Sequence, residues 1–355
     1  MRGRKSEGVA KANRPAQGAT VIDVAAKAGV SAMTVSRVIN GRSGVSSATR
    51  ELVERAIAEL HYVPNVAARS LVTSAELRIG IVYSNPSAAF MSELLTGVFE
   101  EASTRGARLV LLKGEGGRAP TEQALLRFAG AGLSGVLLAP PLAEAPVVLR
   151  TLRNLGVPIA AIGAYHVPGA TCVRIDDRRA AFEMTRHLLD LGHRRLGFVL
   201  GNPDQAASAE RRAGVEDAIR DVPDAGVQLV QGDFSYASGL AAGEQLLDGS
   251  TPPTAVFASN DDMAAAIVSV AHRRQLDVPR QLTVVGFDDT TAAVTLWPPL
   301  TTVHQPVRRL AAEALALLAD EARGAVPKAR ARRDRVLAHE IVKRSSTAAP
   351  PPMGD

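Results

Sequence analysis

From residue 79 onward, short apolar runs alternate with amphipathic stretches of helical length, and this alternation constrains the fold more than any other feature. Runs typical of buried strands occupy residues 79–83, 109–112, 135–139, 159–162, 196–200, 227–230, 255–258 and 283–287. Helix-like stretches occupy residues 92–105, 178–191, 207–220, 237–248 and 262–274. Strands that alternate with helices form right-handed βαβ units and mainly parallel sheets. Because the expected strands, about ten, fill more than one compact sheet usually holds, we expect two α/β lobes.

Composition places the chain among ordinary globular proteins. Its 355 residues are 46% hydrophobic and 22% charged, which suits two or three folding units. A single cysteine, Cys172, cannot form an intrachain disulfide, which indicates a reducing compartment. The basic start at residues 1–5 is not followed by the apolar stretch of a signal peptide, and no run reaches the ~18–20 apolar residues of a membrane helix. We therefore expect a cytoplasmic protein without a membrane partner.

The positive charge is concentrated at one end. Residues 1–72 hold 11 Lys/Arg and 5 Asp/Glu, whereas the rest of the chain holds 30 and 31. Such a distribution is typical of a nucleic-acid-binding head on a neutral body. Charge alone leaves open a solvated basic tail, since five of the basic residues lie in a Gly/Ala-rich lead, residues 1–18, that we expect to be disordered.

Residues 20–40 carry the signals of two short helices joined by a tight turn. Thr20 followed by Asp23 is typical of a helix start, Gly29 readily adopts the positive φ of a turn, and Ser31 is a good N-cap for the second helix. The outward face of that second helix presents side chains that suit base edges and phosphates: Ala32, Met33, Thr34, Ser36 and Arg37.

A third helix should begin at Ser46 or Ser47 and run to about His61. Its inward side chains would be Leu52, Val53, Ala56, Ile57 and Leu60. The three helices predict a helix-turn-helix; a small helical bundle that binds protein is the alternative.

Residues 20–71 resemble the DNA-binding head of the lactose-repressor/galactose-repressor family of transcription regulators. The resemblance is carried by DVA at 23–25, AGVS at 28–31, TVSRVIN at 34–40, YVPN at 62–65 and AARSL at 67–71. It continues to about residue 343.

The resemblance implies roles for individual residues of the head. Phosphates would be contacted by Thr20, Ser31, Thr34, Ser36 and Asn40, and bases in the major groove by Ala32, Met33 and Arg37. Residues 65–71 would form a hinge helix on the DNA, with Asn65, Ala68 and Leu71 at the contact and Leu71 wedged into the minor groove. Such a helix is too short to be stable alone in water. Polar residues often occupy the places of Ala32 and Met33 in this family, so the operator sequence does not follow from the resemblance.

Polar and aromatic side chains gather where the predicted strands end. Ligands of parallel α/β lobes bind beyond the carboxyl ends of the strands. An arginine, several Asp and Asn groups and an aromatic ring are typical of a sugar site. The candidate ligand residues are Ser84, Phe90, Pro140, Arg211, Phe234, Asn260, Asp288 and Trp297. The family resemblance implies that Arg211 binds inducer, that Phe234 stacks on it, and that Asn260 and Asp288 also contact it.

Three pairs of adjacent aspartates could instead belong to a glycosidase: residues 176–177, 261–262 and 288–289. Asp at a strand-to-helix junction more often caps the helix, and neighbours on a strand point to opposite faces. The seven histidines show no metal-ligand spacing. We therefore expect no catalytic residue, no metal and no cofactor.

The sequence predicts a small all-α helix-turn-helix head and an α/β, two-lobed ligand domain of the type I periplasmic-binding-protein kind with parallel sheets. The expected boundaries are a disordered basic arm at 1–18, the helix-turn-helix at 19–64, a hinge helix and linker at 65–76, the ligand-binding and dimerisation domain at 77–344, and a disordered tail at 345–355.

The expected function is a homodimeric repressor of carbohydrate-utilisation genes. Two heads would bind a pseudo-palindromic, double-stranded operator, and a small-molecule effector, a sugar, would bind between the lobes and release the DNA. Two alternatives stay open: a corepressor-dependent regulator with a purine-like ligand, and a sugar-binding transport protein.

Overall fold

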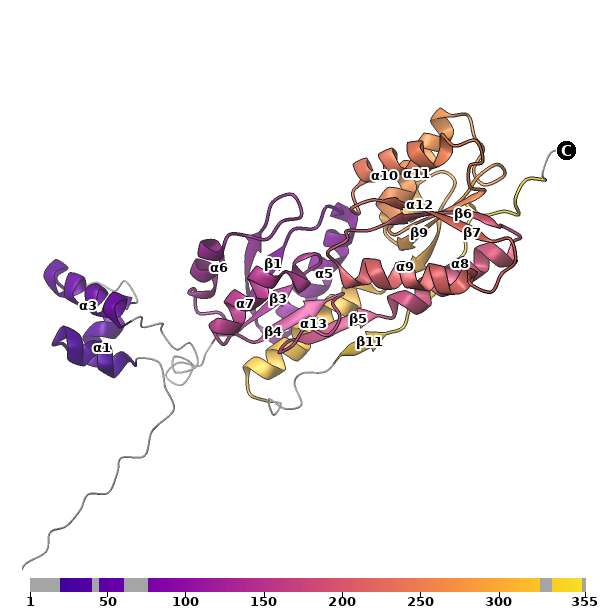
Figure 1. Cartoon of the computed structure of the whole chain (residues 1–355). Helices are drawn as coiled ribbons and strands as arrows, with labels where there is room; N and C mark the ends of the chain where they lie inside the picture. The colour runs from indigo at the N-terminus through magenta and orange to yellow at the C-terminus, as the bar shows by residue number, and fades with distance from the viewer. Residues whose placement is uncertain (1–19, 40–44, 61–75, 326–333, 353–355) are drawn as a thin grey trace, which may run out of the picture. The chain divides into compact units, whose positions relative to one another are not determined.

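The computed structural model describes residues 20–39, 45–60, 76–325 and 334–352 (Figure 1). These residues fall into two compact units, a head formed by residues 20–60 and a body formed by residues 76–352. The predicted arm at 1–18, most of the hinge at 65–76 and the predicted DNA contacts Asn40, Asn65, Ala68 and Leu71 lie outside the described residues.

The head is built from three helices, α1 (Val21–Ala28), α2 (Ala32–Ile39) and α3 (Ser47–Glu59). The predicted helix start is confirmed, because Thr20 and Asp23 form a reciprocal capping box, and Gly29 ends α1 with a φ of 66°. Ser31 caps α2, since its hydroxyl accepts a hydrogen bond from the Thr34 N–H at 3.1 Å. Each helix contributes one fully buried valine to the small core: Val24, Val35 and Val53.

The prediction that Leu52 points inward is wrong. Its side chain is 48% exposed, whereas Val53 and Ala56 are buried. Successive helical residues are rotated by about 100°, so Val53 and Ala56 share the inward face of α3 and Leu52 lies beside it.

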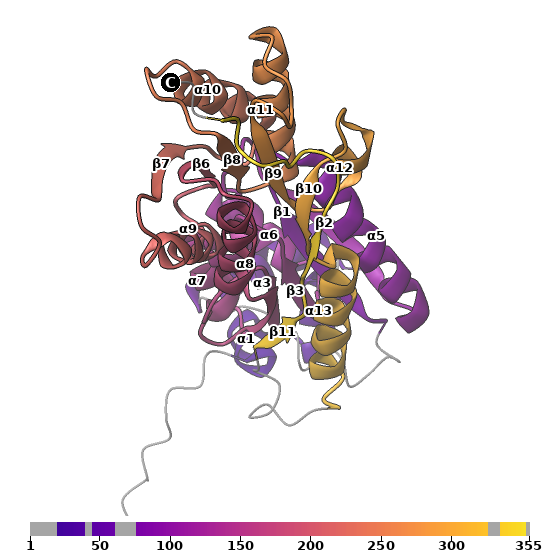
Figure 2. The ribbon, with the colours of Figure 1, turned by 90° about the vertical axis from the view of Figure 1, so that its right-hand side faces the viewer.

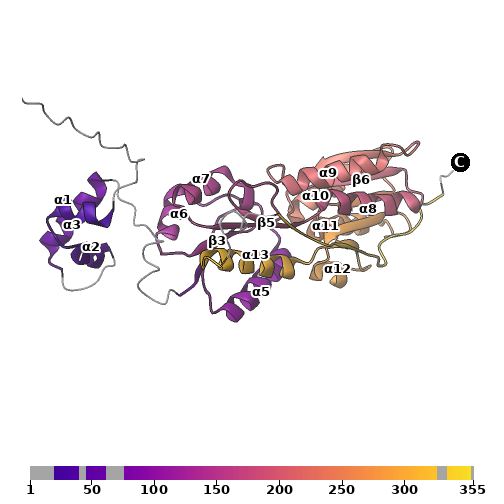
Figure 3. The same ribbon diagram turned by 90° about the horizontal axis from the view of Figure 1, so that it is seen from below.

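The first lobe of the body, the N-lobe, is a six-stranded sheet in the order β11-β5-β4-β3-β1-β2. In Figure 3, α6 and α7 cover one side of this sheet, and α5 and α13 cover the other. Its strands are β1 (Arg78–Tyr83), β2 (Arg108–Lys113), β3 (Gly135–Leu138), β4 (Ile159–Ile162), β5 (Thr171–Ile175) and β11 (Arg335–Leu337). Its helices are α5 (Ala88–Arg105), α6 (Glu122–Ala129), the 3₁₀ turn η1 (Leu142–Glu144), α7 (Pro146–Asn154) and α13 (Val307–Ala322).

The second lobe, the C-lobe, is a six-stranded sheet in the order β12-β10-β9-β8-β6-β7. It lies between the helix pairs α8/α9 and α10/α11 (Figure 2). Its strands are β6 (Arg195–Leu200), β7 (Gly226–Gln231), β8 (Ala255–Ala258), β9 (Thr283–Asp288), β10 (Thr301–His304) and β12 (Glu340–Val342). Its helices are α8 (Asp177–Asp190), α9 (Ala206–Ile219), α10 (Tyr236–Leu247), α11 (Asp261–Arg273) and α12 (Thr291–Thr295).

The chain crosses between the lobes three times: from β5 to α8, from β10 to α13, and from β11 to β12. Neighbouring strands pair in parallel throughout both sheets except β12, which is antiparallel to β10. The predicted two-lobed, parallel α/β architecture is therefore confirmed. Among the described residues, no helix is long and apolar enough to cross a bilayer.

All eight runs predicted as strands are strands, but the sequence reasoning missed four others: β5, β10, β11 and β12. These four strands are only three to five residues long and contain polar residues, so they do not read as buried runs. In β10 the threonines are buried because their hydroxyls have partners: the Thr302 hydroxyl donates to Asp261 Oδ1 at 2.6 Å.

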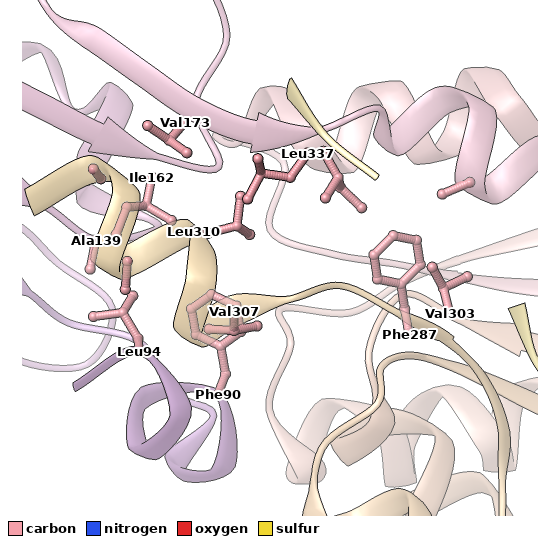
Figure 4. Close-up of a cluster of buried hydrophobic side chains, with 14 of the residues drawn as sticks. Phe90, Leu94, Ala139, Ile162, Val173, Phe287, Val303, Val307, Leu310 and Leu337 are labelled. Carbon is pink, nitrogen blue, oxygen red and sulfur yellow. The ribbon is translucent and has the colours of Figure 1, made fainter. Parts of the chain in front are cut away.

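The largest core cluster spans both lobes (Figure 4). Phe90 of α5 and Val307 of α13 belong to its N-lobe part, and in the C-lobe Phe287 of β9 is paired with Val303 of the neighbouring strand β10. One continuous apolar cluster therefore includes residues of the N-lobe and residues of the C-lobe.

The expected disorder of the tail, residues 345–355, is wrong for its described part. Ser346 is fully buried; its hydroxyl accepts from the Thr301 N–H at 2.8 Å and donates to the Val284 carbonyl at 2.6 Å. The Ala348 carbonyl lies 2.9 Å from Nε2 of the buried His193. Burial lowers the pKa of His193, so a neutral ring donates this bond. The Pro/Ala composition suggested disorder, but most of the tail's hydrogen bonds are made by its backbone.

Replacing Ser346 with Ala should lower the free energy of unfolding by about 1–3 kcal/mol, because the buried Thr301 N–H loses its acceptor. Ser345→Ala is the control, since that neighbouring side chain is exposed. Urea unfolding measures both variants. Equal stability of the two would contradict the docked tail.

Candidate ligand pocket and DNA-binding surface

A pocket lies between the two lobes of the body, where strands of both sheets end. The N-lobe contributes Asn85, Ser87, Phe90, Pro140, Ile162 and Gly163. The C-lobe contributes Gln205, Ala207, Arg211, Phe234, Asn260 and Asp288. Residues at or near the crossings complete the wall: Ile175, Asp177, Gln305 and Leu310.

Six of the eight predicted ligand residues line this pocket: Phe90, Pro140, Arg211, Phe234, Asn260 and Asp288. They come from elements far apart in the sequence, and the ends of parallel strands bring them together, as expected for this architecture.

Ser84 and Trp297 do not line the pocket. Ser84 is buried on the other side of the chain, where its Cβ would lie 3.1 Å from a Cβ added at Gly114, while its neighbour Asn85 faces the pocket. Adjacent residues in extended chain point in opposite directions. Trp297 is 79% exposed, because α12 carries the chain outward before the Leu300 N–H returns to the Ala293 carbonyl.

Arg211 is held at the centre of the pocket by charge, hydrogen bonds and an aromatic face. Its Nε donates to Asp177 Oδ1 at 2.8 Å, and its Nη1 donates to the Ser259 carbonyl at 2.5 Å. The guanidinium carbon lies 3.5 Å from the centre of the Phe287 ring, a cation–π distance. These contacts fix the guanidinium plane without using all of its five donors.

Asn260 and Phe234 are fixed together. The Asn260 side chain accepts from the Met263 N–H at 3.0 Å, capping α11, and donates to the Phe234 carbonyl at 2.9 Å. Phe234 has the unusual φ of 71°, and its ring packs on Gly201, where a Cβ would approach Cζ to 1.9 Å. Only glycine at 201 leaves room for the ring in this position.

Asp288, at the end of β9, and Asp261, at the start of α11, are two buried carboxyls of the C-lobe. Asp288 Oδ1 accepts from Gln305 Nε2 at 2.5 Å, and burial raises its pKa well above the usual value although Arg211 opposes this. Asp261 accepts hydrogen bonds from the Thr290 N–H, the Thr290 hydroxyl and the Thr302 hydroxyl. Burial nevertheless raises the pKa of Asp261 to about 7.

The sequence reasoning missed several polar residues of the pocket wall: Ser87, Asp177, Gln205 and Gln305. Asp177 had a detectable signal, since it follows Asp176 at the end of a strand. Asp176 caps α8 as expected, with its Oδ1 accepting from the Arg179 N–H at 3.0 Å, and this leaves Asp177 to pair with Arg211. The two glutamines gave no signal, because each lies in a loop before a helix.

The predicted DNA-contacting side chains that the structure describes lie at the surface of the head. Thr20, Ser31, Ala32 and Arg37 are exposed, Thr34 is half-buried, and Met33 is 67% exposed. Ser36 is a residue of α2. Buried valines on the opposite face of α2 hold it against α1 and α3, so its outward face is rigidly presented.

A helix-turn-helix head and a two-lobed pocket in one chain define a ligand-responsive DNA-binding regulator. Residues 20–65 match the model of bacterial regulatory proteins of the lacI family, and residues 185–347 match that of the periplasmic binding protein-like domain. The HTH-type transcriptional regulator CelR of Thermobifida fusca is 38% identical over 85% of this chain and 91% of its own. The chain belongs to the lacI family; it is a transcriptional regulator and not an enzyme, as predicted.

Solved structures agree with this assignment. A transcriptional regulator CelR–cellobiose complex is 33% identical with a TM-score of 0.68, covering 94% of this chain and 100% of that one. The lac repressor dimer bound to operator and the anti-inducer ONPF is 29% identical with a TM-score of 0.69 over the same shares. The predicted family and fold class are confirmed.

The raised pKa of Asp261 predicts a pH dependence of stability. The folded chain holds a proton up to about pH 7 that the unfolded carboxyl, with a pKa of 3.8, has already lost. The free energy of unfolding should therefore fall as the pH rises between those two values. Asp261→Asn cannot ionise and should reduce this fall. Urea unfolding at several pH values measures the difference, and parallel pH profiles would show that the carboxyl is ionised throughout.

Proposed function

We propose that the chain is a cytoplasmic, homodimeric repressor of carbohydrate-utilisation genes that leaves its operator when a sugar binds between the lobes. This proposal rests on one observation. The same chain has an exposed recognition helix, α2, and a pocket lined by aromatic rings and by hydrogen-bonding groups that are held in place. A transport protein would have no use for the head.

The chemistry of the pocket favours a neutral polyhydroxy ligand. Arg211 and Asn260 are donors, the oxygens of Asp288 and Asp177 are acceptors, and the Phe234 ring offers a flat apolar face. Hydroxyl groups of a sugar both donate and accept, while its C–H face packs on a ring. Among the described residues of the wall, Arg211 is the one basic side chain and it is already paired with Asp177, so an anionic ligand such as a nucleotide would find no unpaired positive charge.

Cellobiose is the first ligand to test, since it is bound in the CelR complex that this chain resembles. A purine-like corepressor is the second candidate, and the direction of the effect separates the two. An inducer lowers operator affinity, whereas a corepressor raises it.

Exposed apolar side chains on the body support a dimer. Phe99 of α5 and Leu111 of the edge strand β2 are 49% and 44% exposed, and Val294 and Trp297 near α12 are 54% and 79% exposed. A second copy would cover such side chains, and the lac repressor that this chain resembles is a dimer on its operator. A two-fold pair of bodies would present two heads to the two half-sites of a pseudo-palindrome.

Asp288→Asn should weaken cellobiose binding about 2- to 10-fold, because the amide nitrogen replaces one carboxyl oxygen and a hydrogen bond between neutral groups contributes roughly 0.5–1.5 kcal/mol. Its thermal stability without ligand should not fall, since burial already disfavours the ionised form of Asp288. Ser84→Ala is the control outside the pocket and should bind as wild type does. Isothermal titration calorimetry measures the affinities. Wild-type affinity in Asp288→Asn would exclude this carboxyl from the site.

Arg37→Ala should weaken binding to a selected operator by about 1–3 kcal/mol and relax the preference at one base pair. Arg55→Ala removes the same charge from an exposed position of α3 and should keep the base preference. Gel shifts with a set of single-base operator variants measure both. An unchanged preference in Arg37→Ala would remove this residue from the base-reading surface.

A further inference from the structure

The carboxylate of Glu144 joins the two lobes beside the pocket. Glu144 ends the η1 turn that follows β3 in the N-lobe. Its Oε1 accepts from the Tyr165 N–H at 2.9 Å, within the N-lobe. Its Oε2 accepts from the Ala206 N–H at 2.8 Å, and Ala206 is the first residue of α9 in the C-lobe.

The start of α9 lacks a side-chain cap of its own. Gln205 occupies the N-cap position and makes no capping hydrogen bond. The first N–H groups of a helix have no partner within the helix, and a carboxylate there is favoured by both hydrogen bonding and the helix dipole. Glu144 therefore caps α9 from the opposite lobe, and this contact exists only while the lobes are together.

The same carboxylate is connected to the ligand-binding arginine. Glu144 fixes the backbone of Tyr165, whose hydroxyl donates to Asp177 Oδ2 at 2.9 Å. Asp177 in turn accepts from Arg211 through its other oxygen. Arg211 is itself a residue of α9, so the helix that Glu144 caps also carries the central side chain of the pocket.

We propose that Glu144 is a positioning residue that holds the lobes closed before any ligand arrives, and so sets the fraction of the chain that is ready to bind. Apparent ligand affinity scales with that fraction. The effect on sugar affinity rests on the proposed function, whereas the effect on closure does not.

Closure can be measured without ligand by double electron–electron resonance on the full chain. Spin labels at Gln123→Cys on α6 and Gln245→Cys on α10 report the distance between the lobes, because both positions are exposed. The only native cysteine, Cys172, is buried and should not be labelled. The test variants are Glu144→Gln, which keeps one acceptor oxygen, and Glu144→Ala, which removes both.

The labelled wild type should show a population at the short, closed distance, and both variants should deplete it, Glu144→Ala more strongly. Glu122→Gln, an exposed acid in the first turn of α6, is the matched control and should leave the distribution unchanged. Unfolding midpoints verify that the variants are folded. A wild type without a closed population, or variants with the wild-type distribution, would overturn the proposal.

Cellobiose titration supplies a second readout. Losing a charged hydrogen bond across the cleft should weaken binding about 10-fold in Glu144→Gln, while saturating cellobiose should restore the closed distance. If cellobiose does not change the distances of the wild type, the sugar assignment fails while the distances without ligand still decide the role of Glu144. Wild-type cellobiose affinity in both variants would contradict the proposed coupling.

Discussion

The ion pair between Arg211 and Asp177 is the interaction on which the rest of the pocket depends. Their side chains are only 7% and 3% exposed, and a buried charge that loses its partner costs about 3–5 kcal/mol. Asp177 begins α8, at the first place where the chain passes from the N-lobe to the C-lobe. Arg211 lies on α9, which packs along α8. The pair therefore holds the segment that connects β5 to α8 against α9. It also orients the Arg211 guanidinium in the pocket.

Three crossings join the two lobes of the body. Each lobe has its own sheet, and the pocket takes its wall from both. A ligand that contacts both Arg211 of the C-lobe and Phe90 of the N-lobe binds best when the two lobes lie at one particular distance and angle. Such a ligand therefore favours one arrangement of the lobes. A ligand shifts such an equilibrium only by its difference in affinity for the two arrangements. Groups that bridge the lobes, such as Glu144, set the starting point of that equilibrium.

Periodicity and local rules predicted much of the molecule. The capping box at Thr20, the turn at Gly29 and the long apolar runs are local features, and the structure has all of them. Asn260 and Asp288 were found because strand ends converge in parallel sheets.

The predictions that were wrong concern positions whose environment depends on residues far away in the sequence. Whether Leu52 or Val53 faces the core depends on the packing of α3, and the docking of Ser346 depends on backbone groups of strands far away in the sequence. Trp297 was predicted to line the pocket because it is aromatic and near a strand end. The loop after α12 instead leaves its side chain exposed at the surface.

If the pocket controls the head, a ligand that binds in the pocket must change the affinity of the chain for its operator. Fluorescence anisotropy of an operator selected from random DNA, titrated with the full chain with and without cellobiose or other saccharides, tests this most directly. We expect the chain to bind the selected operator at least about 10³-fold more tightly than random DNA, and one saccharide to abolish that difference. Binding without sequence preference, or operator binding that no saccharide changes, would contradict it.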